Sequence, residues 1–186
     1  MRTATTSAGF TLLELLVTIT ILSVLLGFAN YSWNAWADRG RLRASLENYH
    51  SLFAYARWAA ASHRQLVTVC PLSADNQCTD DWQRPISVFI DHNNDKQPDD
   101  NSILRQLTAG SGSFDIRSRT GGRGYFQFNS EGMIHGATGS LVLCPGRRTT
   151  ATMVYMALNK GGRFRVQYDE DGDNKIRLSW GATITC

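Results

Sequence analysis

The sequence is poor in proline, and this shortage bears on the fold. It has four prolines in 186 residues, and the first of them is Pro71. Proline breaks a helix because it lacks a backbone N–H and its ring clashes with the preceding turn. No such break is present before Pro71, so we expect residues 10–29 to form a straight helix without a pronounced kink.

Cysteine is also scarce, and none of the four cysteines has the C-x-x-C spacing that zinc and redox sites favour. An even number fits disulfides, which require an oxidising compartment. Cys70 and Cys78 can close a short loop, and Cys144 can tie the C-terminal Cys186 to the body of the protein. Four cysteines allow three pairings, and the sequence alone does not choose among them.

Charge of either sign is modest, with a net charge of +3 that does not by itself imply a nucleic-acid partner. The distribution is uneven, however. Residues 66–116 carry three basic and eight acidic side chains, whereas residues 117–186 carry ten basic and five acidic ones. The C-terminal third is therefore the basic part of the chain.

One membrane-length apolar run is present, at residues 10–29. It contains no proline and only one charged side chain, Glu14. About 20 residues are enough to cross a hydrocarbon core as a helix. A secretory signal peptide has a shorter apolar core with a cleavage site after it, whereas here the polar leader, residues 1–9, ends directly before the long run. Processing should therefore remove the leader and keep the helix.

The start of this run, from Gly9 and Phe10 to Glu14, resembles the class III, or prepilin, signal of type IV pilins and type II secretion pseudopilins. The resemblance implies that a prepilin peptidase cuts after Gly9 and that the new N-terminus, Phe10, is methylated. A carboxylate in hydrocarbon needs a partner or a proton. The family implies the terminal amine of a neighbouring subunit, so Glu14 is expected to direct assembly. The alternative is an ordinary signal anchor that tolerates a glutamate.

The rest of the chain predicts an amphipathic continuation and a β-rich head. Apolar residues recur at helical spacing over residues 30–64, so one helix is predicted from residue 10 to about residue 62. Short runs rich in β-branched and aromatic residues then predict about seven or eight strands within residues 65–186. The expected fold class is α+β, with a long N-terminal helix packed on an antiparallel β-sheet head, as in the type IV pilin lollipop.

The order of these pieces resembles the GspH/FimT family, which includes minor pilins of the FimT and FimU kind and the H pseudopilin. The stretches that carry the resemblance are VFIDHNNDKQPDDNSILRQL at 88–107, FQFNSEGM at 126–133, LVLCPG at 141–146 and LNKGGRFRV at 158–166. It implies a single-pass inner-membrane protein with a periplasmic head, later part of a pilus at the cell surface. The implied partners are other minor and major pilins. Three roles remain open: a pilin for DNA uptake in natural transformation, a structural or priming minor pilin, and an H-type pseudopilin of a type II secretion system.

The sequence Gly162-Arg163-Phe164-Arg165 is the clearest binding motif. Arginines at i and i+2 of a strand share one face, so both can contact successive phosphates while Phe164 anchors the other face. In FimT-like DNA-uptake pilins a C-terminal Gly-Arg-x-Arg motif contacts DNA, and the resemblance implies that role here. Binding would use the backbone of double-stranded DNA, without sequence preference. The alternative is a solvated edge strand whose charges prevent edge pairing. The expected further contacts are Lys160, Arg147, Arg148 and Arg177.

A second basic patch lies in RSRTGGRG, which contains Arg117, Arg119 and Arg123. Glycines between cations suit an adaptable backbone contact, and Tyr125 can stack on an exposed base. The favoured interpretation is nevertheless a hairpin loop with solubilising charge.

Two acidic stretches, DHNNDKQPDD at 91–100 and DEDGDNK at 169–175, have Asp or Asn at alternate positions. Both lack the Gly and Glu that an EF-hand loop requires at its sixth and twelfth positions, so we expect Asx-rich turns and no metal. The histidines have no nucleophile or metal-ligand spacing beside them. We therefore expect neither an enzyme nor a cofactor. The histidines are His50, His63, His92 and His135.

Overall fold

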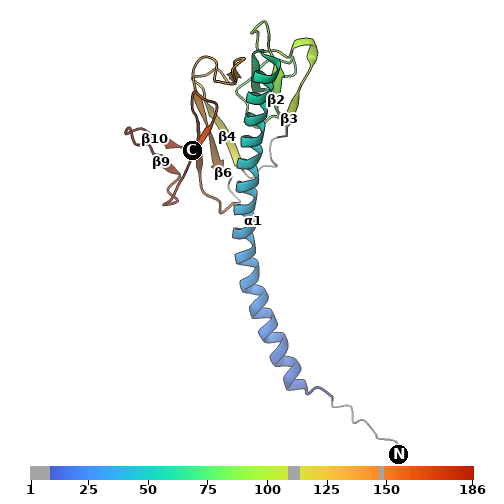
Figure 1. Cartoon of the computed structure of the whole chain (residues 1–186). Coiled ribbons are helices and arrows are strands. Elements are labelled where there is room, and N and C mark those ends of the chain that lie inside the picture. Colours follow the sequence, from blue (N-terminus) through green and yellow to red (C-terminus); the bar gives the residue numbers. More distant parts are fainter. Residues whose placement is uncertain (1–8, 109–113, 147–148) are drawn as a thin grey trace, which may run out of the picture.

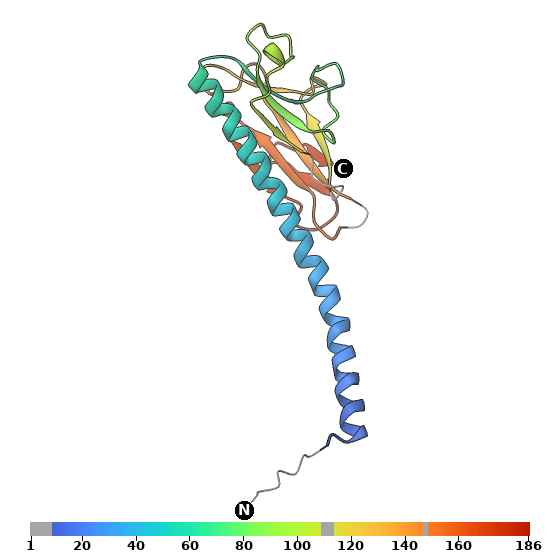
Figure 2. The ribbon, with the colours of Figure 1, turned by 90° about the vertical axis from the view of Figure 1, so that its right-hand side faces the viewer.

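The structure, a computed structural model, describes residues 9–108, 114–146 and 149–186, and only the backbone at 28–32. One helix, α1, runs from Leu12 to His63 over 52 residues. The hydroxyl of Thr11 caps its first turn by accepting the N–H of Glu14, and Arg64 ends it in a left-handed conformation. The predicted single helix is confirmed, and it curves gently without a sharp kink (Figure 1 and Figure 2).

The lower part of α1 projects away from the head (Figure 1). Its large apolar side chains are about half or more exposed, from Leu12 at 77% to Leu26 at 56%. Among the described residues, no helix has the length and apolar character needed to cross a membrane. The predicted membrane passage of residues 10–29 therefore stays a prediction.

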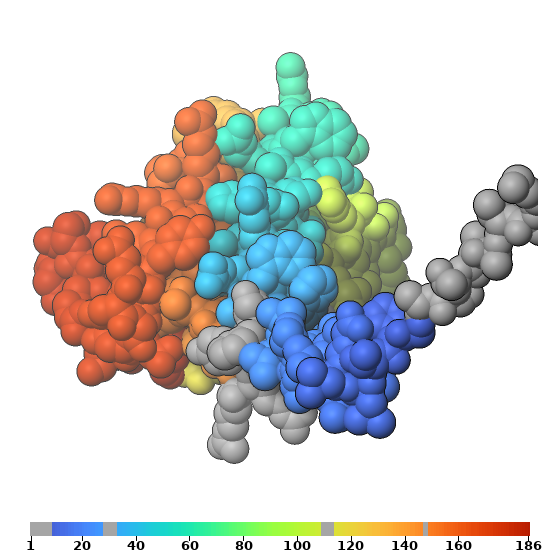
Figure 3. All heavy atoms as spheres, turned by 90° about the horizontal axis from the view of Figure 1, so that it is seen from below, coloured from blue at the N-terminus to red at the C-terminus, as the bar shows by residue number. Residues whose placement is uncertain are grey.

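The upper part of α1 packs on a head built from two four-stranded antiparallel sheets and a two-stranded hairpin. Seen from below, the C-terminal residues lie on one side of α1, and the segment around β3 (Arg105–Leu107) lies on the other (Figure 3). A short 3-10 turn, η1, spans Asp99–Asn101. The first sheet has the strand order β3 (Arg105–Leu107), β2 (Ile86–Ile90), β1 (Val67–Pro71), β5 (Phe126–Phe128). The second sheet has the order β4 (Phe114–Arg119), β6 (Gly139–Pro145), β7 (Val154–Leu158), β8 (Phe164–Tyr168). The hairpin pairs β9 (Lys175–Arg177) with β10 (Thr183–Thr185).

The predicted α+β class, with a long helix packed on an antiparallel head, is confirmed. The strand count was wrong, because ten strands form in the described part of the chain. One missed strand is β4, which contains Arg117 and Arg119, two residues that the sequence assigned to a loop. Its buried Phe114 and Ile116 alternate with charged residues and pair it with β6. The other missed strand, β10, has only three residues and forms because it pairs with β9.

Aromatic rings join α1 to both sheets. Phe53 is 1% exposed, and its ring centroid lies 5.2 Å from Phe126 on the first sheet and 4.7 Å from Phe164 on the second. Such edge-to-face contacts add to the free energy gained by burying the rings. The position of β8 against the helix is therefore set by Phe164.

A polar contact fixes α1 lower down. The buried carboxylate of Asp38 accepts the backbone N–H of Thr150 at 2.8 Å and its hydroxyl at 3.1 Å. The bond from that N–H is the main cause that lowers the pKa of Asp38, and Arg41 at 3.0 Å contributes as well. This contact marks the level at which the helix joins the head.

Two disulfides complete the head, and they are the two pairs singled out in the sequence. Cys70–Cys78 and Cys144–Cys186 have Cα atoms 5.5 and 5.6 Å apart. The second bond ties the end of the chain to β6. It lies beside a small apolar cluster between the outer face of the second sheet and the β9–β10 hairpin, made of Val142, Cys144, Met153, Tyr155, Ile176, Leu178 and Ile184.

Tyr49 provides a test of the core. Its side chain is 2% exposed, and its hydroxyl has no hydrogen-bond partner among the described residues. Burial raises the pKa of Tyr49, because a charged phenolate oxygen would lack solvation there. We expect Tyr49→Phe to stabilise the protein by about 1 kcal/mol, since it removes a buried polar group that lacks a partner.

Thermal unfolding of the two proteins measures this difference. Tyr168→Phe is the matched control, because its side chain is 53% exposed and water can solvate its hydroxyl, so little change is expected. A lower Tm for Tyr49→Phe than for the parent chain would contradict the prediction.

Candidate functional site

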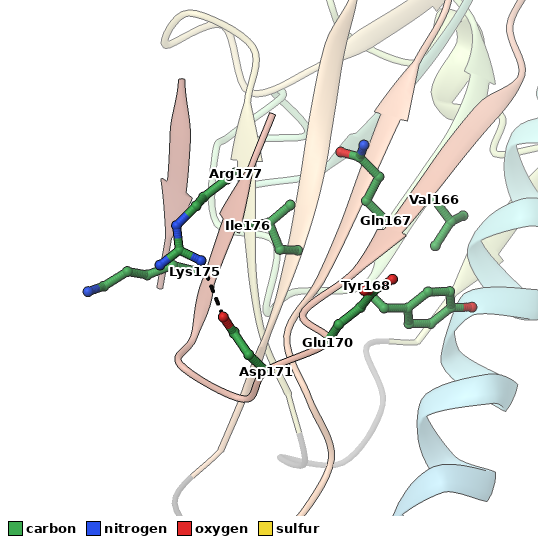
Figure 4. A pocket seen from close by; sticks show the side chains of 8 residues that line it. All are labelled: Val166, Gln167, Tyr168, Glu170, Asp171, Lys175, Ile176 and Arg177. Atoms are coloured by element: carbon green, nitrogen blue, oxygen red, sulfur yellow. Dashed lines mark hydrogen bonds and ion pairs between the residues drawn. The ribbon is translucent and has the colours of Figure 1, made fainter. Parts of the chain in front are cut away.

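The edge strand β8 carries the predicted binding motif. It is last in the sheet order β4-β6-β7-β8, and among the described residues it pairs only with β7, so no strand of this part of the chain covers its other edge. Along β8 the side chains alternate between the side of α1 and the side of the β9–β10 hairpin. Figure 4 shows this for the second half of the strand, where Val166 and Gln167 lie on opposite sides.

The first half of β8 places its residues in the same alternation. Phe164 faces α1, with its ring 4.7 Å from Phe53 and 5.3 Å from His50. Arg165 is exposed on the other side of β8, and Arg163 is exposed in the turn directly before this strand. Neither side chain forms a hydrogen bond or ion pair within the described residues. Two guanidinium groups without a partner among these residues therefore lie at the start of the edge strand.

A tight turn between β7 and β8 holds Arg163 in place. The N–H of Asn159 donates to the carbonyl of Arg163 at 3.0 Å, and the side chain of Asn159 accepts the N–H of Arg163 at 3.0 Å. Gly162 donates to the Asn159 carbonyl at 2.9 Å. The backbone of the motif is thus ordered before any ligand binds.

Gly162 itself is buried. Its φ is +71°, and a Cβ atom there would lie 2.7 Å from the Cε1 atom of Phe128. Arg57 on α1 donates to the neighbouring carbonyl of Gly161 at 3.3 Å. The glycine of the motif therefore serves the turn, while the arginines are free to bind.

The other predicted cations differ in how free they are. Lys160 lies in the same turn, where its ammonium donates to the carbonyl of Gly136 at 3.1 Å. Arg147 and Arg148 lie outside the described residues. Arg177 on β9 forms ion pairs with Asp173 at 2.7 Å and Asp171 at 3.3 Å, the latter drawn in Figure 4.

These carboxylates raise the pKa of Arg177. The hydrogen bond from its guanidinium to Asp173 is the main cause that raises the pKa of Arg177, followed by the charges of Asp173 and Asp171. The charge of Arg177 is therefore largely balanced within its own hairpin. Arg163, Arg165 and Lys160 lie near one another around the turn between β7 and β8, whereas Arg177 is paired with Asp171 and Asp173 near β9.

The arginines of the second basic patch also differ in whether they have partners. Arg117 is paired with Asp115 at 2.7 Å and also donates to the carbonyl of Cys186. Arg123 donates to the carbonyl of Thr120 at 2.7 Å and lies over the ring of Tyr125. Arg119 is exposed and has no ion pair within the described residues. Its place on a strand was missed, although the alternation of Phe114 and Ile116 was the available signal.

The acidic stretches form turns. Asp91 is fully buried and accepts the hydroxyl of Thr68 at 2.7 Å and the amide of Gln127 at 3.0 Å. Asp169 is 3% exposed and accepts the N–H of Asn174 at 2.8 Å. Asp173 accepts the N–H of Lys175, two residues on, at 2.8 Å, as in an Asx turn. The oxygens of Asp169 lie within 4.8 Å of those of Asp171 and Asp173, the two partners of Arg177. The arginine supplies the positive charge at this cluster.

The residues of the predicted processing signal lie at the start of α1. Gly9 and Phe10 precede the helix, and Phe10 is 83% exposed. Glu14 lies in the first turn and is exposed, so its carboxylate is available to a second molecule.

Two family profiles match the chain. The profile of the family described as Type II transport protein GspH matches residues 45–181, and that of the prokaryotic N-terminal methylation motif matches residues 5–30. No curated protein sequence matches the chain.

Two crystal forms of one minor pilin have a similar fold. The type IV minor pilin FimU of Pseudomonas aeruginosa, in one crystal form, is 15% identical with a TM-score of 0.57, covering 73% of this chain and 97% of its own. A second crystal form of FimU gives 14% identity and a TM-score of 0.53, covering 69% and 97%. The minor pseudopilin EpsH from the Type 2 Secretion System of Vibrio cholerae is 13% identical with a TM-score of 0.48, covering 69% and 98%.

Proposed function

Because this chain belongs to the family of the Type II transport protein GspH, we propose that it is a minor type IV pilin that binds extracellular DNA for uptake in natural transformation. Its head carries two disulfides, which suit a periplasmic and then extracellular location. The chain would be held in the inner membrane by residues 10–29 and then join a pilus. Its partners there would be other minor and major pilins.

The N-terminal residues support the assembly part of this proposal. The methylation-motif profile matches residues 5–30, which include Gly9, Phe10 and Glu14. A prepilin peptidase would cut after Gly9 and leave Phe10 as the methylated N-terminus. The exposed carboxylate of Glu14 would then pair with the terminal amine of a neighbouring subunit, since an unpaired charge among apolar helices is costly.

The observation that carries the DNA-binding part is the pair of guanidinium groups at the start of β8 that have no partner among the described residues. Arg163 is held by the turn at Asn159, and Arg165 lies on β8 opposite Ala157. Arginine binds phosphate oxygens through a planar fork of donors. Contacts of this kind hold the DNA backbone without reading its sequence, with Lys160 as a further cation beside them. The proposed role is binding and structural, without catalysis.

Duplex binding by the full chain in a nonionic detergent tests this proposal, using fluorescence anisotropy with a labelled DNA of mixed sequence. Arg163→Ala and Arg165→Ala are each expected to weaken binding several-fold. Each is also expected to reduce the slope of log affinity against log salt by about 1, because each removes one phosphate contact. Folding of each variant is checked by its Tm.

Arg177→Ala and Arg84→Ala are matched controls, because both side chains are already paired with aspartates. Both are expected to leave the affinity nearly unchanged. Binding that is indifferent to Arg163 and Arg165 would overturn the DNA proposal. It would leave a purely structural or priming minor pilin, or an H-type pseudopilin of a type II secretion system.

A further inference from the structure

A groove of about 360 Å³ lies on the second sheet, beside the hairpin, and the proposed contact with duplex DNA does not use it. Ser140 on β6 and Ala157 on β7 line it as neighbouring small residues. Arg119 on β4 and Trp180, in the turn between β9 and β10, line it as well. Its size is that of a site for a small ligand or a single building block of a polymer.

The strand register places a cation at each end of one row across this face. Arg119 pairs with Ser140, Ser140 with Ala157, and Ala157 with Arg165. Directly paired residues lie on the same face of a sheet, and neighbouring strands are about 4.8 Å apart, so the two arginines are roughly 14 Å apart at their Cα atoms. Within the described part of the chain, both are exposed and form no ion pair.

Trp180 supplies a flat apolar surface beside this row. It is 65% exposed and makes no ring contact within the described residues. The turn that holds it is rigid, because Leu178 donates to the carbonyl of Ala182 at 2.8 Å and Gly181 donates to that of Leu178 at 2.9 Å. An exposed indole on an ordered turn, next to arginines, is the arrangement that stacks on nucleobases.

Ser140 offers a hydrogen-bonding group to a ligand in the groove. The residue lines the groove and is 4% exposed, and its hydroxyl forms no hydrogen bond with any described residue. A ligand that offers hydrogen-bonding groups would give this hydroxyl a partner.

We propose that this groove binds one unpaired nucleotide of DNA, an inference that rests on the proposed function and extends it to DNA ends. The base stacks on Trp180, the hydroxyl of Ser140 bonds to the nucleotide, and the flanking phosphates lie near Arg119 and Arg165. A base inside a duplex has both faces covered by its neighbours, so only an unpaired base can present a face to the indole.

The test compares two labelled DNAs on the full chain in nonionic detergent. One is a covalently closed circular duplex, in which every base is paired, and the other is the same duplex in linear form with a short single-stranded overhang. We expect the overhang to raise the affinity about tenfold, the size of one base–aromatic stack. Trp180→Leu should remove this preference, and Trp180→Phe should keep most of it. Trp58→Leu, a change at another exposed tryptophan, is the matched control and should keep all of it.

The outcomes separate this inference from the proposed function. Equal affinity for the two DNAs, or an overhang preference that survives Trp180→Leu, overturns the proposed nucleotide site in the groove. This holds even if the closed duplex binds through Arg163 and Arg165. If the overhang preference depends on Trp180 but closed-duplex affinity is unchanged by Arg163→Ala and Arg165→Ala, the proposed duplex contact is overturned. The nucleotide site in the groove is then supported. Absence of binding to both DNAs overturns both.

Discussion

Replacing Gly162 with alanine is expected to destabilise the folded protein by about 3 kcal/mol. Gly162 has a φ of +71°, which strains any residue with a side chain. The added Cβ would lie 2.7 Å from the ring of Phe128 and 3.1 Å from Cδ of Arg57. Phe128 is fully buried, so its ring has little room to move.

The neighbouring glycine is a matched control for this change. Gly161 lies in the same turn without a positive φ, and its nearest contact for a new Cβ is Asn159 Oδ1 at 3.4 Å. In thermal unfolding we expect Gly162→Ala to lower the Tm by roughly 10 °C and Gly161→Ala to change it little. Equal Tm values would contradict the role assigned to Gly162. The prediction also means that loss of DNA binding in a Gly162 variant would report unfolding of the turn.

Removing the disulfide at the C-terminus is expected to have a larger effect. The double change Cys144→Ser and Cys186→Ser opens a loop of 42 residues, and the chain-entropy estimate for such a loop is about 4 kcal/mol. The hairpin of β9 and β10 would then be held mainly by its small apolar cluster on the second sheet. A two-stranded hairpin is marginal without such support. We therefore expect hydrogen exchange to accelerate first in residues 175–185.

Chemical denaturation and hydrogen exchange of the oxidised parent and the variant measure both effects. The control removes the other disulfide through Cys70→Ser and Cys78→Ser. That loop spans only 8 residues, so the expected loss is about 2.5 kcal/mol and should leave protection of the hairpin unchanged. A larger loss from the short loop, or a hairpin that stays protected without Cys186, would disagree with this account.

The sequence was sufficient where local pattern alone decides the structure. The absence of proline and the helical spacing predicted α1 nearly to its ends, because neither depends on distant residues. The alternation of Arg163, Phe164 and Arg165 was likewise readable, because a strand has a period of two residues. The structure adds the reason for Phe164 facing inward, which is its contact with Phe53.

Tertiary contacts decided the rest. The place of Arg119 opposite Ser140 depends on the pairing of β4 with β6, and a run containing two arginines resembles a loop. The pairing of Arg177 with Asp171 and Asp173 was missed, although all three belong to one hairpin and their closeness in the chain was a signal. The groove beside Trp180 could not be predicted from the sequence, because it forms only where the hairpin lies on the sheet.

The exposed apolar part of α1 also sets a minimum for the number of neighbours that the helix needs. Successive residues of a helix are rotated by about 100°, so Leu12, Leu13, Leu15 and Leu16 point in different directions around the axis, and all are about half or more exposed. A single partner helix would cover one stripe and leave the others in water. A simple dimer is therefore not a stable end point for this chain. Its helix needs an apolar environment on every side, from lipid or from several copies packed around it.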